Sequence, residues 1–167
     1  MAKNDKKAAT ARSGAVEIVQ QVLGEGAYTN IAVNKYLRSH ELSDMDRRLM
    51  TELVYGTVKA VGTIDWYLQQ CVTRPLDKID KLVLSILRIS VYQLLYMDKI
   101  PASAACNEAV NLARLFTHEG NAKFVNGVLR GLLRKKDSFI FPDKEKETAD
   151  YISLAMYHPR WLVKKWL

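Results

Sequence analysis

The stretch of residues 77–97, DKIDKLVLSILRISVYQLLYM, constrains the fold of this chain more than any other. Its apolar residues lie most of the way round a helical wheel, and one narrow polar stripe is made by Lys81, Ser85, Arg88 and Tyr92. A helix that is apolar on most sides is buried in a large core or in a membrane. Charged residues interrupt this run too often for a membrane span, which needs about 20 apolar residues in a row. We therefore expect a central core helix with Asp77 as its N-cap and other helices around it.

Helical periodicity continues on both sides of this stretch, divided by glycines, prolines and capping signals. Ser43 followed by Asp46 is typical of a helix start, and Gly62 and Gly120 break the chain. We expect six further core helices, over residues 8–23, 29–37, 43–62, 63–74, 101–116 and 121–136. No window shows the alternation of polar and apolar residues that indicates a strand. The sequence therefore predicts an all-α bundle of about seven helices.

Composition and charge narrow the class of protein. The chain has 167 residues, of which 49% are hydrophobic and 26% charged, as in an ordinary globular domain. Its formal charge of +7 favours a polyanionic partner, most commonly nucleic acid. The polar N-terminus has no apolar leader, and Cys71 and Cys106 lie on apolar helical faces, as buried free thiols do. We expect a cytoplasmic, monomeric protein without a membrane partner.

No set of residues forms a recognisable active site. His40, His118 and His158 are scattered, without the spacing of metal ligands. No glycine-rich phosphate loop follows a strand, and a nucleophilic Cys71 would need a cationic, exposed setting. We therefore expect no catalytic residue, no metal and no cofactor in these residues.

The clearest candidate for binding is a basic strip on the last core helix. One helical face carries Lys123, Gly127, Arg130 and Arg134, and Lys135 and Lys136 extend the charge. A phosphate backbone fits such a strip, with amide contacts from Asn121 and Asn126. The alternative is a solvated helix face whose cations lie near the negative end of the helix dipole.

Other polar groups give weaker signals. We expect residues 1–7 to be a mobile basic arm. Its Lys3, Lys6 and Lys7, with Arg12 in the first helix, are a second candidate group for binding nucleic acid. The alternative is a flexible Lys-rich N-terminus that only aids solubility. Arg47 and Arg48, with Lys59, are a third group, for which we expect salt bridges to Asp44 or Asp46. Asn107, Asn111, Arg114 and His118 make a polar stripe that we interpret as a solvated face.

The C-terminal part has a different character. Residues 137–149 combine Pro142 with mixed charges, which is typical of a linker. Two short helices follow, and Trp161 and Trp166 need a partner surface. We expect residues 137–167 to be a linker and the start of a connection to a following domain.

Several segments together resemble one known family. They are, in order, YTNIAVNKYL, LSDMDRRLMTELVYGTVKAVGTIDWYL, RPLDKID, ILRISVYQLLYMDKIPASAACNEAVNLA and NAKFVNGVLRGLLR. In this order and spacing they resemble the N-terminal domain of the RsmB family, bacterial enzymes that make 5-methylcytosine in small-subunit ribosomal RNA. The resemblance covers residues 12–167 and implies a NusB-like helical domain over residues 8–136.

The resemblance also implies a division of roles. The family's catalytic domain binds S-adenosylmethionine and attacks cytosine with a cysteine, but its sheet and Pro-Cys and Thr-Cys-Pro motifs do not occur here, and Cys71 and Cys106 do not match them. The chain would thus bind ribosomal RNA and position it, through Lys6, Lys7, Arg12, Lys123, Asn126, Arg130, Arg134, Lys135 and Lys136. Trp161 and Trp166 would contact its own C-terminal methyltransferase domain. The alternatives are a module that only docks the catalytic domain, or a freestanding NusB-like antitermination factor.

Overall fold

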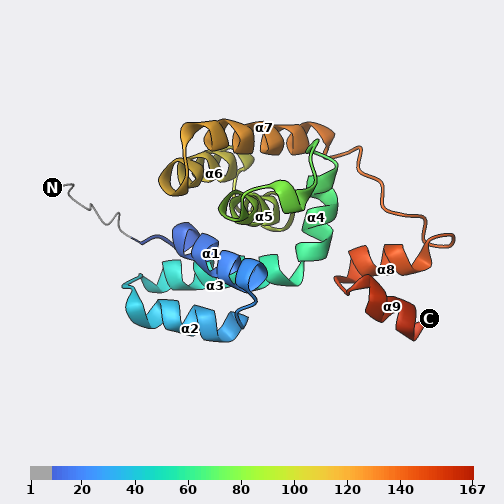
Figure 1. Cartoon of the computed structure of the whole chain (residues 1–167), viewed down its shortest axis with the longest axis horizontal. Coiled ribbons are helices and arrows are strands. Elements are labelled where there is room, and N and C mark those ends of the chain that lie inside the picture. Colours follow the sequence, from blue (N-terminus) through green and yellow to red (C-terminus); the bar gives the residue numbers. More distant parts are fainter. Residues whose placement is uncertain (1–8) are drawn as a thin grey trace.

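The computed structural model of the chain describes residues 9–167, and over that range the chain forms nine α-helices and no strand. The helices are α1 (Ala11–Val19), α2 (Thr29–Ser39), α3 (Asp44–Lys59), α4 (Val61–Gln69), α5 (Lys81–Tyr96), α6 (Ala102–Phe116), α7 (Glu119–Lys135), α8 (Thr148–Met156) and α9 (Arg160–Trp166). In Figure 1, α2 lies at one end of a helical body and α7 at the other, and α8 and α9 lie beside it. The predicted all-α class is confirmed.

The central position of α5 is confirmed as well. It packs against α1, α3, α4, α6 and α7, and Ile86, Leu87 and Ile89 are completely buried. Except for the exposed Lys81 at its start, the polar stripe faces other helices. Arg88 donates two hydrogen bonds to Asp65 of α4, at 2.9 and 2.8 Å, and the ring of Tyr92 fills the space beside Gly56 of α3. The stripe therefore serves packing inside the bundle.

The predicted start of the central helix is wrong by one turn. Its N-cap is Asp80, whose Oδ1 accepts hydrogen bonds from the amides of Leu82 and Val83 at 2.9 and 3.1 Å. Asp77 lies instead in a short 3-10 turn, Leu76–Lys78. The extended residue between them, Ile79, is buried, so the chain must change direction there before the helix begins.

Other predicted boundaries also shift, and the helix expected over residues 63–74 ends already at Gln69. The first helix begins at Ala11, after the N-cap Thr10, and ends in a π-helical turn, Gln20–Gly24. The break between α3 and α4 falls at Ala60 rather than at Gly62. Gly120 does not break the chain, because α7 already begins at Glu119 and the turn before it is made by Thr117 and His118. Glycine in a first helical turn is tolerated, so its presence alone did not locate the turn.

The segment after α7 lies against the helical body. The ring of Phe139 meets Tyr67 edge-on at a centroid distance of 5.0 Å, and Phe141 meets Trp66 in the same way at 5.0 Å. Further along, the hydroxyl of Thr63 donates to the carbonyl of Leu154 at 2.8 Å. These contacts attach the segment to α4 and hold α8 beside it.

Candidate nucleic-acid interface

The helix α7 has two faces of opposite character. Its inner face is buried and is made by Ala122, Val125, Val128, Leu129 and Leu132. Lys123, Arg130 and Arg134 are exposed on the other side. The predicted amphipathic helix is thus present, and its three cations are accessible to a ligand.

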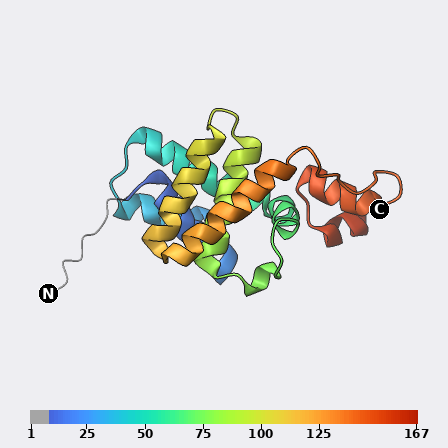
Figure 2. The ribbon, with the colours of Figure 1, turned by 90° about the horizontal axis from the view of Figure 1, so that it is seen from above.

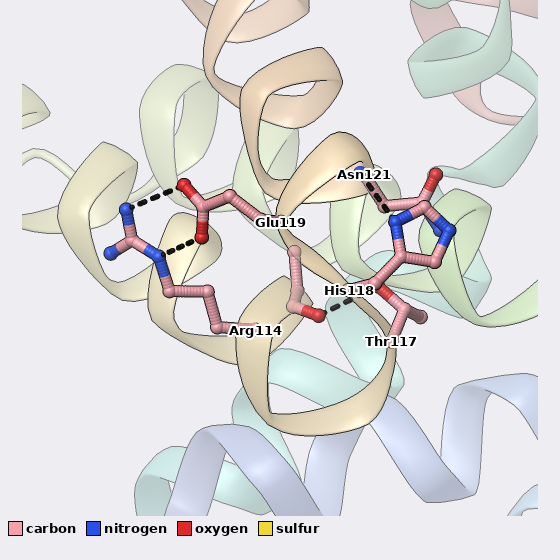
Figure 3. A network of polar contacts seen from close by, with 6 residues as sticks. Arg114, Thr117, His118, Glu119 and Asn121 are labelled. Atoms are coloured by element: carbon pink, nitrogen blue, oxygen red, sulfur yellow. Dashed lines mark hydrogen bonds and ion pairs between the residues drawn. The ribbon is translucent and has the colours of Figure 1, made fainter.

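The turn between α6 and α7 fixes the start of this helix (Figure 3). The ring nitrogen Nδ1 of His118 accepts a hydrogen bond from the amide of Asn121 at 3.3 Å, and Thr117 donates to the carbonyl of Ala113 at 2.6 Å. His118 therefore caps α7.

The tight turn between α6 and α7 brings polar residues of α6 beside the basic strip of α7. Figure 2 shows α6 and α7 side by side, and one groove runs between them. It is lined by Asn107, Val110, Asn111 and Arg114 of α6 and by Glu119, Ala122, Lys123, Asn126 and Arg130 of α7. The polar stripe on α6, interpreted from the sequence as a solvated face, thus forms one wall of the groove.

The residues of the two walls could have been paired from the sequence. Two helices joined by a tight turn bring residues equally distant from that turn opposite each other. Around the turn at residues 118–119, these pairs are Arg114 with Lys123, Asn111 with Asn126, and Asn107 with Arg130. The α6 wall was missed because the sequence analysis expected the turn at Gly120, whereas it lies at residues 118–119.

One cation of the groove is neutralised. Arg114 donates to both carboxylate oxygens of Glu119, at 2.8 and 3.2 Å (Figure 3). This hydrogen-bonded pair lowers the pKa of Glu119 below its ordinary value and raises that of Arg114, so both groups stay charged at neutral pH. The net positive charge of the groove therefore comes from α7 alone.

Arg130 lines the groove and contacts Asn126 one turn earlier on α7. Its Nε is 3.4 Å from Oδ1 of Asn126, to which it donates. Burial raises the pKa of the Cys106 thiol on α6, and the nearby charge of Arg130 opposes that effect. Arg130 and Asn126, two predicted RNA-binding residues, are thus brought together.

The two lysines that end the strip differ. Lys135 donates to the carbonyl of Gln70 at 2.9 Å, which ties the end of α7 to the end of α4. Lys136 is exposed just after the helix. The structure therefore gives Lys135 a structural contact, while Lys136 continues the exposed cations.

The predicted N-terminal group divides. Lys3, Lys6 and Lys7 lie outside the described residues. Arg12 belongs to α1 and donates from Nε to Oε1 of the buried Gln93 at 2.9 Å. Arg12 is therefore held against the central helix, and a role for it in RNA binding stays a prediction.

The salt bridges expected for Arg47 and Arg48 do not form. Within residues 9–167 neither side chain has an ion-pair partner, and Asp44 and Asp46 lie in the first turn of α3, near its positive end. An exposed ion pair gains little free energy and costs side-chain entropy, so a favourable spacing in the sequence is not enough to form one.

Two further searches cover the described range. In that range no three His, Cys, Asp or Glu side chains come close enough to share a metal ion. No helix between residues 9 and 167 has both the length and the apolarity needed to cross a membrane. Both cysteines are free thiols, but only Cys106 is buried, while Cys71 is half-buried.

Large aromatic surface remains uncovered at the C-terminus. Trp161 and Trp166 of α9 are 68% and 64% exposed, and Leu167 beside them is exposed too. On the same helix Val163 is buried, so α9 is held on one side only. The two tryptophans predicted to need a partner are accessible to one.

Comparison with known proteins identifies the fold family. The sequence pattern of the NusB family matches residues 9–134, which is most of the chain. The chain belongs to the NusB family. Solved structures agree: a crystal structure of the antitermination factors NusB and NusE in complex with dsRNA superposes with a TM-score of 0.69 and 19% identity, over 74% of this chain and 93% of that one. The solution structure of NusB from Aquifex aeolicus superposes with a TM-score of 0.67 and 19% identity, over 82% of this chain and 96% of that one.

The similar full-length proteins confirm the predicted kinship with the RsmB family. The probable ribosomal RNA small subunit methyltransferase B of Bacillus subtilis (strain 168) is 38% identical over 161 residues, which is 96% of this chain and 35% of that protein. Its namesake from a Synechocystis strain is 36% identical over 157 residues, 93% of this chain and 34% of the relative. The NusB-family chain thus spans about a third of the length of these relatives.

Proposed function

We propose that this NusB-family chain is the RNA-binding, substrate-positioning domain of a methyltransferase that makes 5-methylcytosine in the RNA of the small ribosomal subunit. The observation that carries the proposal is the α7 strip, Lys123, Arg130 and Arg134, exposed on a helix whose other face is needed for packing. Cations in such a row neutralise phosphates and release counterions. The relatives, which are named as ribosomal RNA small subunit methyltransferases, support ribosomal RNA as the polyanion.

In this proposal the chain takes no part in the chemistry. S-Adenosylmethionine binds to a separate catalytic domain that follows α9 in the full protein, and the whole acts in the cytoplasm as a monomer. RNA contacts by the α7 strip extend to Asn126, Lys135 and Lys136, and at the N-terminus to Lys6, Lys7 and Arg12. The half-buried hydrogen bond of Arg12 to Gln93 supports only a small contribution from that residue.

Salt dependence of RNA binding tests the proposal. Fragments of small-subunit ribosomal RNA should bind the 167-residue chain with an affinity that falls linearly in log K against log salt, with a slope of about −0.7 to −0.9 per neutralised phosphate. Fluorescence anisotropy at several salt concentrations measures this slope. An affinity that is absent at low salt, or independent of salt, would falsify the proposal.

A labelling experiment tests the division of roles. The chain incubated with labelled S-adenosylmethionine and ribosomal RNA should leave the RNA unlabelled, because neither Cys71 nor Cys106 matches the family's nucleophile. The full-length enzyme from Bacillus subtilis serves as the positive control. Label in cytosine that depends on this chain alone would overturn the assignment.

A second function, docking of the catalytic domain, is favoured by the exposed aromatic surface of α9. Trp161 and Trp166 present apolar area that a following domain would cover. We assign this contact to the two tryptophans and RNA binding to the α7 strip, so the two functions use separate surfaces. Replacing both tryptophans by alanine should weaken association with a separately produced catalytic domain and leave RNA affinity unchanged.

A further inference from the structure

We propose that the groove between α6 and α7 reads the bases of single-stranded RNA, with Asn107 and Asn111 of α6 and Asn126 of α7 as the residues that determine specificity. The inference deepens the proposed function and rests on it, because it names the form of RNA that the same surface accepts. Nothing in the likeness to known proteins assigns Asn107 or Asn111 a role.

The two walls of the groove differ in charge, and this difference orients the RNA. Lys123 and Arg130 make the α7 wall cationic. On the α6 wall the only charge, that of Arg114, is bonded to the carboxylate of Glu119. A nucleotide strand in the groove therefore places its phosphates over α7 and turns its bases toward α6.

The α6 wall offers the base edges free amides. Within residues 9–167 the side chains of Asn107 and Asn111 make no hydrogen bond, and both are exposed. Asn126 makes one long hydrogen bond, accepted from Arg130 at 3.4 Å. A free asparagine amide has a donor and an acceptor side by side, which match the paired donor and acceptor on the edge of a base.

The floor and rim of the groove suit a base rather than a duplex. Val110 is the partly exposed apolar lining residue, against which the face of a base can pack. Beside the cationic wall, Gly127 has open space where a side chain would stand, so the rim is low there. In a duplex of RNA the major-groove edges of the bases lie too deep for side chains to read, whereas an unpaired strand exposes them.

Phosphate contacts and base contacts have different signatures. Phosphate contacts set the salt slope and are nearly independent of sequence, whereas amide contacts to bases distinguish one sequence from another. Loss of the asparagines should therefore remove discrimination and leave the salt slope as it was. Loss of the cations should reduce the salt slope and leave the discrimination between sequences as it was.

The test uses the 167-residue chain and a pool of single-stranded RNA with randomised positions. Sequences enriched by the unaltered chain are measured against scrambled versions and against the same sequence in a duplex. Asn107→Ala/Asn111→Ala should reduce the preference for the enriched sequence about tenfold or more, with an unchanged salt slope. Asn30→Ala/Asn34→Ala, which alters two exposed asparagines on α2, is the matched control and should keep the full preference.

Each outcome decides something. No binding by the unaltered chain contradicts the proposed function itself. Salt-dependent binding without any enriched sequence, equal affinity for the duplex, or a preference that survives Asn107→Ala/Asn111→Ala overturns the inference and leaves the proposed function standing. Asn107→Ala and Asn111→Ala are also measured singly, and thermal melting checks that every variant is folded. If the double variant is unfolded, the folded single variants still test the inference.

Discussion

The helices α5 and α7 are both long and regular, yet they use their sequences in opposite ways. After the exposed Lys81, the polar residues of α5 face other parts of the protein, as Arg88 does with Asp65 and Gln93 does with Arg12. On α7 the polar face stays in water, and Lys123, Arg130 and Arg134 have no ion-pair partner within residues 9–167. A polar stripe on a helix therefore indicates function only when the rest of the fold leaves it uncovered.

The largest effect is expected when a charge is placed in the buried helix α5. Leu87→Asp puts a carboxylate at a completely buried position of α5, which costs several kcal/mol because nothing there can pair with it. Since domains of this size are stable by about 5–15 kcal/mol, the variant should be largely unfolded by circular dichroism. Met45→Asp, at an exposed position in the first turn of α3, is the control and should melt like the unaltered chain. Unchanged melting of Leu87→Asp would place α5 outside the core.

A smaller effect is expected where the C-terminal segment touches the body. Phe139→Ala/Phe141→Ala removes two half-buried rings from Trp66 and Tyr67, at about 1–2 kcal/mol per ring. The melting temperature should fall, and amide exchange of α8 should rise before that of α5, because α8 packs on α4 at the edge of the helical body whereas α5 is central. Ile140→Ala, at an exposed position between the two rings, should change neither. If both observables are unaltered in the double variant, the segment is a free linker.

The smallest effect concerns one buried hydroxyl. The hydroxyl of Thr57 is buried without a hydrogen-bond partner, unlike every other buried side-chain polar atom in residues 9–167. Thr57→Val keeps the shape and removes an unpaired polar group, so the free energy of unfolding should rise by up to about 1 kcal/mol. Thr63→Val is the contrasting change, because the Thr63 hydroxyl donates to the carbonyl of Leu154, and it should be destabilising. Chemical denaturation measures both, and a destabilised Thr57→Val chain would indicate an ordered water or another partner at that hydroxyl.

The sequence predicted the faces of helices better than their ends. Periodicity alone placed Leu87 in the core and the α7 cations outside, because a helix turns its residues to fixed directions. The choice between Asp77 and Asp80 as N-cap was not predictable in this way, since both have the right chemistry and burial of Ile79 decides between them.

Contacts between distant elements were beyond local patterns. Phe139 and Phe141 pack on α4 from a segment without helical periodicity, so no pattern in the sequence predicted this contact. The groove wall of Asn107 and Asn111 became recognisable only once the turn between α6 and α7 was placed at residues 118–119. The sequence therefore predicted the α7 side of the candidate binding surface and missed the α6 side.

Two arginine pairs, one on α7 and one on α3, give the most direct test of RNA binding by α7. Arg130→Ala/Arg134→Ala removes two cations from α7, and Arg47→Ala/Arg48→Ala removes two exposed, unpaired cations from α3. Both variants should melt like the unaltered chain. For binding to small-subunit ribosomal RNA fragments, only the α7 variant should lose affinity, with a salt slope reduced by about 0.7 to 0.9 for each phosphate that is no longer neutralised. Equal losses of affinity in both variants, or full affinity and slope in the α7 variant, would contradict the central claim that α7 carries the RNA.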